Sequence, residues 1–582
     1  MVFAKMTDTT RSNLPLSTES RTSHRTLRWV ALLTLAIVLT RSILITHAHS
    51  EYWDDQYHLL RGLAMLDRTS AGLTFNDPPM GEWLEAIPLW IAGIHPHGPD
   101  AFGGDTKLQL ANVIYRQRLS PESIRMIVVI WKSLLFVPAA LIVFIWCRRL
   151  YSARAAWLAL ALVLIDPTIA GHIPTAALDV LGMEGILLAC FAADAYLRKP
   201  SHQRAILAAL ASAAAMCLKH TGVITPAVVL LIMVIGSRQR ETLRRIPLFI
   251  LVTLLGIWAF TLFDISKPAA VLDPLLINAT KHAWTHWTLP AGVYLGALAN
   301  GLAHSHLGHR AFLFGQYSTS GWWYYYPVVA LYKIPLGILL IFILILTLIP
   351  FSIREEIRIR MKIKIREKYQ WIPLTCFSAW TILAIASHIN IGFRHFLPAY
   401  LFLLMLISGV VASATTSFLI SIILTISAFL QTLPFHPDYL SYVNFPNTKY
   451  WWTIGDSNVD WGQGMKQIDH WLAAHPRPGR EVYLRRFTDP YGLGVRYYLG
   501  AQIQILSKFD PPPAHGLLII SMVHEGGAYT ENSPYRALKS TPPDAIIGHS
   551  MLVYDLDRIT AGRGMDWPRI NETTRSSTVP VD

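Results

Sequence analysis

The hydrophobic positions of this chain form long, nearly uncharged runs that are separated by short polar segments. The first run covers residues 29–46 and carries one charge, Arg41. Ten more runs lie near 126–147, 155–171, 178–197, 205–219, 221–236, 246–265, 327–350, 371–389, 398–413 and 416–433. Most of these runs approach the roughly 20 residues that a helix needs to cross a bilayer core. The pattern predicts a mainly α-helical, polytopic bundle of about eleven membrane spans.

Basic residues alternate with the spans and predict their direction. Lys and Arg gather after the second, fourth, sixth and eighth spans, at 148–154, 198–204, 238–245 and 354–368. Because positively charged loops stay on the cytoplasmic side, the N-terminus is predicted to be cytoplasmic and the C-terminus to be outside. This divides the chain into a cytoplasmic tail (1–28), a transmembrane domain (29–433), outer loops (47–125 and 266–326), an extracytoplasmic domain (434–565) and a disordered tail (566–582).

The part of the chain after the last span has a different pattern. Short apolar runs at Leu517–Ile520 and Met551–Tyr554 are typical of β-strands, and the stretch near 465–472 is typical of a helix. We therefore expect a small α+β domain on the outer side of an integral membrane protein.

The composition agrees with a membrane protein. Of the 582 residues, 53% are hydrophobic and 15% are charged, whereas about a quarter are charged in soluble domains. The net charge of +13 is one that nucleic-acid-binding proteins also carry. Since the excess Lys and Arg lie between apolar runs, topology explains the charge better, and we expect no nucleic acid partner. The four cysteines lie inside apolar runs without metal spacing, so no disulfide framework is predicted.

Two adjacent carboxylates, Asp54 and Asp55, follow the first span closely. Acidic groups near a bilayer surface are costly unless they are hydrated, paired or functional. Partial burial and mutual repulsion would raise the pKa of one of them, which suits a general base. A solvated acidic loop would have the same sequence, so position alone leaves both interpretations open.

Cationic residues near the outer ends of later spans are candidates for binding an anion. Arg394 joins the ninth and tenth spans on the predicted outer side, where a guanidinium suits a phosphate headgroup. Snorkelling to lipid phosphate is the alternative. Lys333 lies just inside the eighth span, and a lysine there rarely lacks a role. His304, His306 and His309 cluster in the second outer loop, but no ligand pattern completes a metal site.

Several motifs, taken in order, resemble glycosyltransferase family 39, the protein O-mannosyltransferases and their bacterial relatives within the C-type superfamily. They are Asp54-Asp55, Asp77-Pro78-Pro79-Met80, the segment 172–179 that ends in Asp179, Lys219-His220-Thr221-Gly222, the segment 308–335 with Arg310 and Lys333, Arg394-His395-Phe396-Leu397-Pro398, and the segment 456–463. The family pattern has Asp-Glu in the first motif and His-Pro-Pro-Leu in the second, so Asp55 departs from it as the second acid and Asp77 as the residue before the prolines.

The resemblance implies a donor and a set of roles. The donor would be mannose or another hexose on a polyprenyl phosphate, and the acceptor a hydroxyl of a protein, lipid or glycan. Asp54 would be the base, and Asp55 would orient the acceptor or a divalent cation; no other cofactor is expected. The donor-phosphate site would comprise Arg394, Lys333, Arg310, Lys219, His395 and Asp179.

Other classes of protein share parts of this pattern. A secondary transporter would need charges along a path within the membrane and often has an inverted repeat, which we do not find in the sequence. An oligosaccharyltransferase would carry a Trp-Trp-Asp motif, but Tyr324 follows Trp322 and Trp323 here. A structural scaffold would not require paired carboxylates at the membrane surface.

Overall fold

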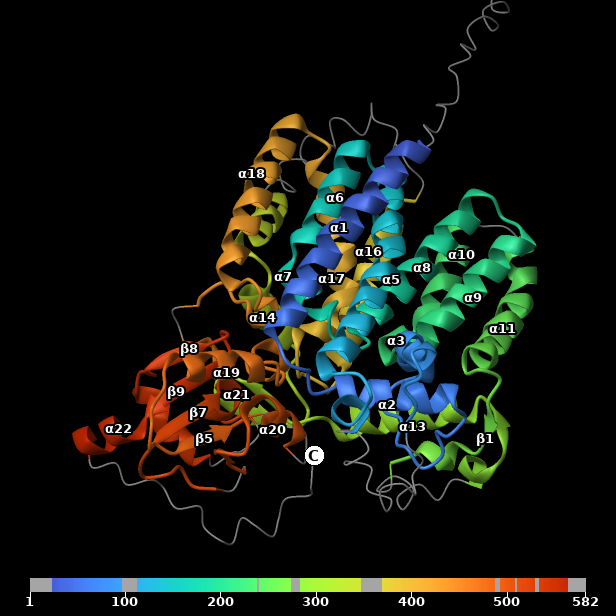
Figure 1. Ribbon diagram of the computed structural model, residues 1–582. Coiled ribbons are helices and arrows are strands. Elements are labelled where there is room, and N and C mark those ends of the chain that lie inside the picture. Colours follow the sequence, from blue (N-terminus) through green and yellow to red (C-terminus); the bar gives the residue numbers. More distant parts are fainter. Residues whose placement is uncertain are drawn as a thin grey trace, which may run out of the picture.

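The computed structural model describes residues 23–96, 112–237, 240–273, 283–346, 369–446, 449–486, 492–507, 510–528 and 533–563. It consists of a helical bundle and a sheet domain at one end of the bundle (Figure 1). The chain enters α1 at the opposite end, so the start of α1 and the sheet domain lie at opposite ends of the bundle. Most of the predicted basic tail, the basic run at 354–368 and the tail after 566 lie outside the described residues.

The predicted spans are present as apolar helices. In the described part of the chain, seven helices are long and apolar enough to cross a membrane and four more are shorter, and together they occupy the positions of the eleven predicted spans. They are α1 (His24–Ala48), α5 (Pro121–Leu150), α6 (Ala153–Ile165), α8 (Asp179–Arg198), α9 (His202–Leu218), α10 (Thr225–Ser237), α11 (Arg240–Phe260), α14 (Tyr325–Lys333) with the helix Leu336–Leu346, α16 (Trp371–Ala386), α17 (Leu397–Val411) and α18 (Thr415–Thr432).

Prolines divide two of the predicted spans. The run 155–171 breaks at Asp166, whose carboxylate accepts a hydrogen bond from the Ile169 N–H at 2.9 Å and caps α7 (Pro167–His172). The run 327–350 breaks before Pro335, because proline lacks the N–H that would continue α14. Both interruptions bring non-helical backbone into the protein interior.

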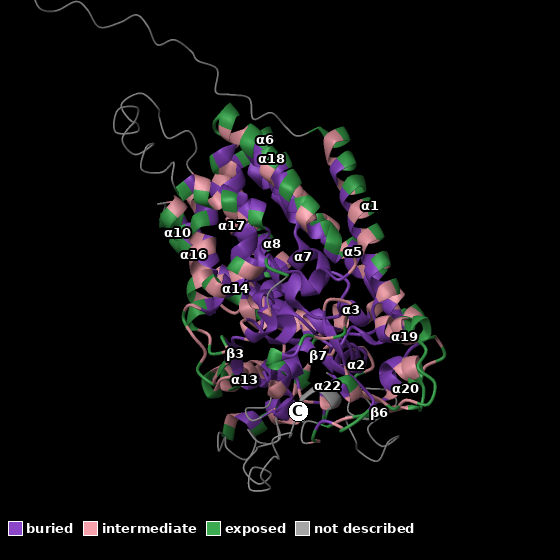
Figure 2. Ribbon diagram, turned by 90° about the vertical axis from the view of Figure 1, so that its left-hand side faces the viewer, coloured by how far each residue is buried: buried purple, intermediate pink, exposed green. Residues whose placement is uncertain are grey.

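Burial separates central helices from peripheral ones. The most apolar window is 72% buried in α8 and in the segment that contains α17, but 28% in α11 and 22% in the segment that contains α18. Large apolar side chains such as Leu254 and Ile423 are exposed on these peripheral helices. Figure 2 shows exposed residues along α1, α10 and α18 around a buried centre. Because soluble proteins rarely expose such continuous apolar faces, these faces are suited to lipid.

The end of the bundle that lies beside the sheet domain carries short helices and two short antiparallel pairs of strands. The first loop forms α2 (Asp55–Leu66) and α3 (Pro79–Ile91), and the second forms α13 (Gly292–Leu307). β1 (Ile265–Ser266) pairs antiparallel with β2 (Leu289–Pro290), and β3 (Ala311–Leu313) forms a hairpin with β4 (Gln316–Ser318).

The C-terminal domain has the predicted α+β composition. Its five strands lie in the order β6-β5-β7-β9-β8, with β5 parallel to β6 and β7, and with β9 antiparallel to β7 and β8. Helices α19 (Met465–Ala474), α20 (Leu493–Leu499), α21 (Met522–Glu525) and α22 (Leu556–Arg563) accompany the strands β5 (Val482–Arg485), β6 (Ile503–Ile505), β7 (Leu517–Ser521), β8 (Ala545–Ile547) and β9 (Met551–Asp555). The expected strands at Leu517–Ile520 and Met551–Tyr554 are therefore confirmed.

The segment that leads into this domain packs directly on the first outer loop. The N–H groups of Ser50 and Trp53 donate to the carbonyls of Gln463 and Trp461, both at 2.9 Å. His49 Nε2 donates to the Asp438 carboxylate at 2.8 Å. These contacts fix the position of the loop that carries Asp54 and Asp55.

Candidate functional site

Four charged side chains from four separate segments form a continuous series of ion pairs at the end of the bundle that lies beside the sheet domain. Arg394 Nη1 donates to Asp54 Oδ2 at 3.1 Å and lies 3.5 Å from Asp179 Oδ2. Asp179 Oδ1 in turn accepts a hydrogen bond from Lys219 Nζ at 2.5 Å. We call the series Asp54–Arg394–Asp179–Lys219 the ion-pair ladder. It unites four of the residues that the sequence singled out.

The adjacent carboxylates Asp54 and Asp55 have different environments. Asp54 is the N-cap residue of α2, yet its side chain makes no capping bond and reaches Arg394 instead. Asp54 keeps 25% of its side chain exposed, whereas Asp55 is 3% exposed. Asp55 accepts the N–H groups of Tyr52 at 3.0 Å and of Ala176 at 2.7 Å. Burial raises the pKa of Asp55. Through its two hydrogen bonds to backbone N–H groups, Asp55 anchors the loop.

Arg394 is held in place by the segment 456–463. The Asn458 side-chain oxygen accepts the Phe393 N–H at 2.9 Å, and Ser457 Oγ donates to the Ile391 carbonyl at 2.7 Å. The Arg394 guanidinium lies over the Trp461 ring, 4.0 Å from its centroid. A cation stacked on an aromatic face keeps its orientation while its N–H groups remain available for other partners.

Helix ends position the inner half of the ladder. Asp179 lies in the first turn of α8 and Lys219 caps the C-terminus of α9, where the helix dipoles favour a negative and a positive charge. Gly182 leaves room for this pair, because a Cβ at position 182 would lie 2.8 Å from Lys219 Cβ.

Several buried polar atoms around the ladder have no hydrogen-bond partner among the described residues. They include His395 Nε2, Arg394 Nε and His172 Nε2. His395 lies close enough to Arg394, Lys219 and Asp179 to interact with their charges. Buried polar groups normally find partners. The unpartnered atoms beside the two cations therefore leave hydrogen-bonding capacity that a polar ligand or water would satisfy.

Lys333 has a different position from the one the sequence suggested. Its ammonium donates to the carbonyls of Leu440, Tyr442 and Asn458 at 2.7, 2.8 and 2.8 Å. An ammonium has three N–H donors, so all of them are used within the protein. Lys333 holds the segments that support Arg394 and does not join the ladder.

Arg310 belongs to the hairpin formed by β3 and β4. Its guanidinium lies over the Tyr317 ring, 4.4 Å from the centroid, and the Tyr317 hydroxyl donates to the carbonyl of Gly527 in the C-terminal domain. The structure thus places Arg310 where the second outer loop meets the sheet domain.

The motif Asp77-Pro78-Pro79-Met80 contributes a further charged pair. Asp77 Oδ1 lies 3.9 Å from His220 Nε2, and His220 directly follows Lys219 of the ladder. From the sequence alone, Asp77 is a departure from a family pattern and no role is predicted for it. The signal that could have identified it is a carboxylate before two prolines, which fix the backbone of the loop.

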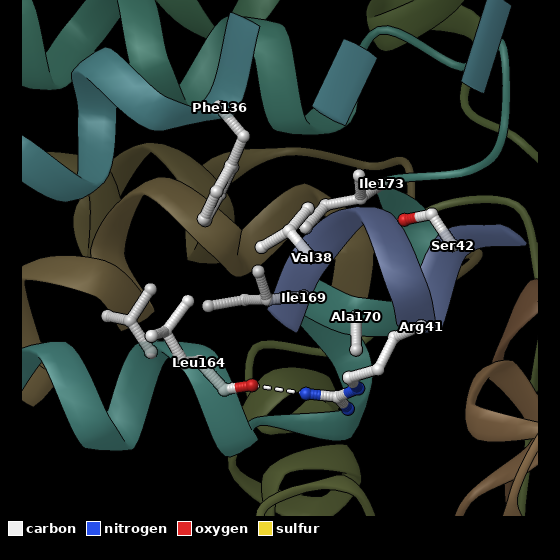
Figure 3. A pocket seen from close by; sticks show the side chains of 9 residues that line it. Val38, Arg41, Ser42, Phe136, Leu164, Ile169, Ala170 and Ile173 are labelled. Atoms are coloured by element: carbon white, nitrogen blue, oxygen red, sulfur yellow. Dashed lines mark hydrogen bonds between the residues drawn. The ribbon is translucent and has the colours of Figure 1, made fainter. Parts of the chain in front are cut away.

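A small cavity between α1, α5, α6 and α7 is separate from these charged pairs. It is lined by Val38, Arg41, Ser42, Phe136, Val163, Leu164, Ile169, Ala170 and Ile173. In Figure 3, Arg41 reaches along this cavity and donates to the Leu164 carbonyl. Its free volume of about 10 Å³ is about what one water molecule needs. It cannot hold a sugar, and Arg41 has a structural partner.

In the ranges that the structure describes, no group of three or more His, Cys, Asp and Glu side chains is arranged to hold a metal ion.

Comparison with solved structures finds slight likenesses. ArnT from Cupriavidus metallidurans bound to undecaprenyl phosphate is 13% identical, with a TM-score of 0.44 over 90% of this chain and 97% of that one. The same protein in the apo state gives 12% and 0.43 over 92% and 99%. The archaeal oligosaccharyltransferase AglB from Archaeoglobus fulgidus, in complex with an inhibitory peptide and a dolichol-phosphate, gives 13% and 0.42 over 83% and 65%.

No family model and no curated protein sequence matches this chain. TM-scores of this size do not place it in a family. The multi-span helical architecture with a small C-terminal sheet is present, whereas membership of glycosyltransferase family 39 stays a prediction.

Proposed function

We propose that this protein is a membrane glycosyltransferase that moves a sugar, mannose or another hexose, from a polyprenyl-phosphate carrier to a hydroxyl group of a protein, lipid or glycan. The observation that carries the proposal is the contact between Asp54 and Arg394 at 3.1 Å. It joins a partly exposed carboxylate to a buried cation at the outer end of the bundle. A base and a phosphate-binding group are the two parts that such a transfer needs.

The position of the ladder suits a donor that is anchored in lipid. The ladder lies where α8, α9 and the segment before α17 meet the outer loops. A polyprenyl phosphate keeps its chain in the hydrocarbon region and its phosphate at the interface. Arg394 and Lys219 can therefore meet the phosphate without drawing it into the bilayer, and their charges stabilise the leaving group.

The proposed reaction forms one bond to the anomeric carbon and breaks another. The acceptor oxygen bonds to the anomeric carbon while its proton passes to an Asp54 oxygen. The bond from that carbon to the phosphate oxygen breaks, and its electron pair stays on the phosphate. Attack opposite the leaving group inverts the configuration. A phosphate monoester leaves without protonation, so a second carboxylic acid is not needed.

Donor binding would also release the base. In the unliganded protein Arg394 Nη1 binds Asp54 Oδ2, so this carboxylate oxygen is already occupied. A phosphate that takes over the Arg394 N–H groups frees Asp54 for the acceptor proton. Trp461 keeps the guanidinium plane in place during this exchange.

The other residues singled out by the sequence take supporting roles in the proposal. His395 offers an unpartnered Nε2 beside the phosphate position. Asp179 holds Arg394 and Lys219 together. Asp55 fixes the loop of Asp54, and Lys333 fixes the backbone beneath Arg394. Arg310 supports the junction with the C-terminal domain.

The test is sugar transfer in membranes from a strain that lacks the gene and expresses the wild type or one variant. Membranes receive polyprenyl-phosphate mannose or glucose with a radiolabelled sugar, and label in protein, lipid and glycan is counted. Asp54→Asn should lower transfer by roughly 10²- to 10⁴-fold, the usual contribution of a general base. Arg394→Gln should lower it comparably.

The matched control is Asp67→Asn. Asp67 also lies in the first outer loop and also pairs with a basic side chain, here His95 at 3.0 Å, but it is not part of the ladder. Near-wild-type transfer is expected for this control. Transfer by Asp54→Asn at more than half of the wild-type rate would refute the proposed base.

A further inference from the structure

The loop before α3 and the turn after α9 bring a second partly exposed carboxylate to the ladder. Asp77 and His220 are 143 positions apart in sequence and lie 3.9 Å apart, with 21% and 28% of their side chains exposed. Their accessibility contrasts with Arg394, Asp179 and Lys219, whose side chains are at most 9% exposed. Asp77 and His220 are therefore more accessible to solvent than the buried charges beside them.

Asp54 and Asp77 each lie near one of the two buried cations. Asp54 contacts Arg394 at one end of the ladder. At the other end, Asp77 is close enough to Lys219 to interact with its charge. Both carboxylates also act on His58, which lies between the segments that carry them. A ligand whose phosphate meets Arg394 and Lys219 would thus lie near both carboxylates.

Asp77 differs from a base in its chemistry. Burial would raise the pKa of Asp77, but the charges of His220 and Lys219 outweigh it and hold the pKa at about 2. An ionised carboxylate has only acceptor positions, and one with so low a pKa accepts protons poorly. It also repels phosphate. The partners that suit it are hydroxyl groups, which donate hydrogen bonds.

We propose that Asp77 and His220 bind ring hydroxyl groups of the sugar that is transferred, while the phosphate of the same donor meets Arg394 and Lys219. The inference rests on the proposed function and adds the group that holds the sugar. It makes Asp77 a specificity residue. A site built to hydrogen-bond a hydroxyl strongly rejects an analogue that lacks it, because the buried acceptor is then left without a partner.

Space for the histidine is provided by a glycine on α13. A Cβ at Gly301 would lie 2.4 Å from the His220 Cε1 atom, so the ring occupies a site that only glycine permits. His220 Nε2 also contacts the Asn76 carbonyl. The second outer loop therefore helps to set the orientation of the pair.

A structural clasp is the competing explanation, since Asp77 and His220 also connect two segments. The two explanations differ in what a variant does to ligand binding. A clasp affects the sugar-bearing and sugar-free lipids alike, whereas a sugar-binding pair affects only the lipid that carries the sugar.

The experiment measures dissociation constants of purified protein for polyprenyl phosphate and for polyprenyl-phosphate mannose and glucose. Wild-type protein should bind at least one sugar-bearing lipid more tightly than polyprenyl phosphate. Asp77→Ala should weaken that binding by roughly 10- to 100-fold, the loss expected for a hydrogen bond to a charged group. Its affinity for sugar-free polyprenyl phosphate should not fall, because a carboxylate that repels phosphate has been removed. Asp67→Ala is the control and should change neither.

A second measurement identifies the hydroxyl and does not depend on the stability of one variant. Monodeoxy derivatives of the preferred donor are compared in wild type and in Asp77→Asn, which keeps the size of the side chain. One deoxy position should weaken wild-type binding, and this loss should shrink in the variant, because interacting groups are non-additive.

Three outcomes would overturn the inference. They are equal weakening of the sugar-bearing and sugar-free lipids by Asp77→Ala and Asp77→Asn, unchanged binding in both variants, and a wild type that gains no affinity from the sugar. The proposed function is tested separately by Arg394→Gln, which should weaken binding of sugar-free polyprenyl phosphate. If Arg394→Gln binds this lipid as the wild type does, the phosphate site itself is misplaced.

Discussion

Replacing the adjacent carboxylates Asp54 and Asp55 one at a time should separate catalysis from stability. Asp55→Ala removes a carboxylate that is 3% exposed and leaves the buried N–H groups of Tyr52 and Ala176 without their acceptor. Asp54→Ala removes a partly exposed carboxylate, and Arg394 keeps its second partner, Asp179. We expect the first variant to be unstable and the second to be folded but inactive.

The size of the contrast follows from the contacts. A hydrogen bond to a charged group contributes about 1.5–3 kcal/mol, so the loss of both bonds of Asp55 should lower the free energy of unfolding by about 3–6 kcal/mol. Asp55→Asn keeps one acceptor oxygen and should cost about half as much. Loss of the partly exposed Asp54 ion pair should cost less, because Arg394 keeps Asp179 as its counterion.

The pH dependence gives an independent check on Asp55. Because burial raises its pKa in the folded state, the folded protein binds this proton more tightly than the unfolded protein does. Stability therefore falls as the pH rises from the ordinary range of an aspartate through the raised pKa. Asp55→Asn cannot titrate and should lose this part of the slope.

Thermal unfolding in detergent micelles and sugar transfer by the folded fraction should be measured on the same preparations. Asp54→Ala should melt close to the wild type and transfer sugar at the background rate. Asp55→Asn should melt earlier, while its folded fraction keeps most of the activity. A stable but inactive Asp55→Asn, or an active Asp54→Ala, would refute the division of roles.

Three further predictions concern contacts outside the ladder. Lys333→Met should destabilise the protein by about 3 kcal/mol or more, since three buried carbonyls lose their donor, whereas the folded fraction should bind polyprenyl phosphate normally in the dissociation assay. The hydrogen bonds of Asp438 to two histidines lower its pKa. The wild type should therefore lose stability in melting scans as the pH falls below about 4, and Asp438→Asn should lack this slope. The four native cysteines are buried, so an engineered cysteine should be the main site that an impermeant maleimide labels. Lys539→Cys should be labelled in intact cells and Glu241→Cys only after permeabilisation. The reverse result would invert the proposed topology.

The arrangement of spans was predictable because it depends on local composition. A run of about twenty apolar residues has few structures available in lipid other than a helix. The division at Asp166 was not predicted, since the apolar run continues across it, although Pro167 was visible as a signal. Short-range patterns therefore predicted how many helices cross the bundle better than they predicted where each helix ends.

The site was predictable only in part. Asp54 and Arg394 stood out because charged groups at a membrane surface are unusual, and the structure brings them within 3.1 Å. Lys333 stood out for the same reason, but a lysine that is satisfied by carbonyls has the same sequence signal as one that binds a ligand. Which of the two occurs depends on whether distant carbonyl groups, here those of Leu440 and Asn458, lie next to the ammonium of Lys333. The pairing of Asp77 with His220 likewise depends on packing between distant segments.

The charge balance of the ladder leads to a last prediction. Two carboxylates and two cations leave the ladder formally neutral, so an incoming phosphate must replace a carboxylate as the partner of Arg394. A phosphate can replace Asp54 as the partner of Arg394, because Asp54 is partly exposed. Asp179 is buried between Arg394 and Lys219. Asp179→Asn would leave two buried cations without their shared counterion, which costs about 3–5 kcal/mol in comparable pairs.

A phosphate could then supply the missing charge. Asp179→Asn should therefore melt earlier than the wild type without ligand and should gain more thermal stability from saturating polyprenyl phosphate, because a ligand that binds only the folded state stabilises it in proportion to its affinity. Asp67→Asn should respond to the lipid as the wild type does. If Asp179→Asn gains less from the lipid than the wild type, then Asp179 aids phosphate binding through the geometry of the two cations and does not compete for their charge.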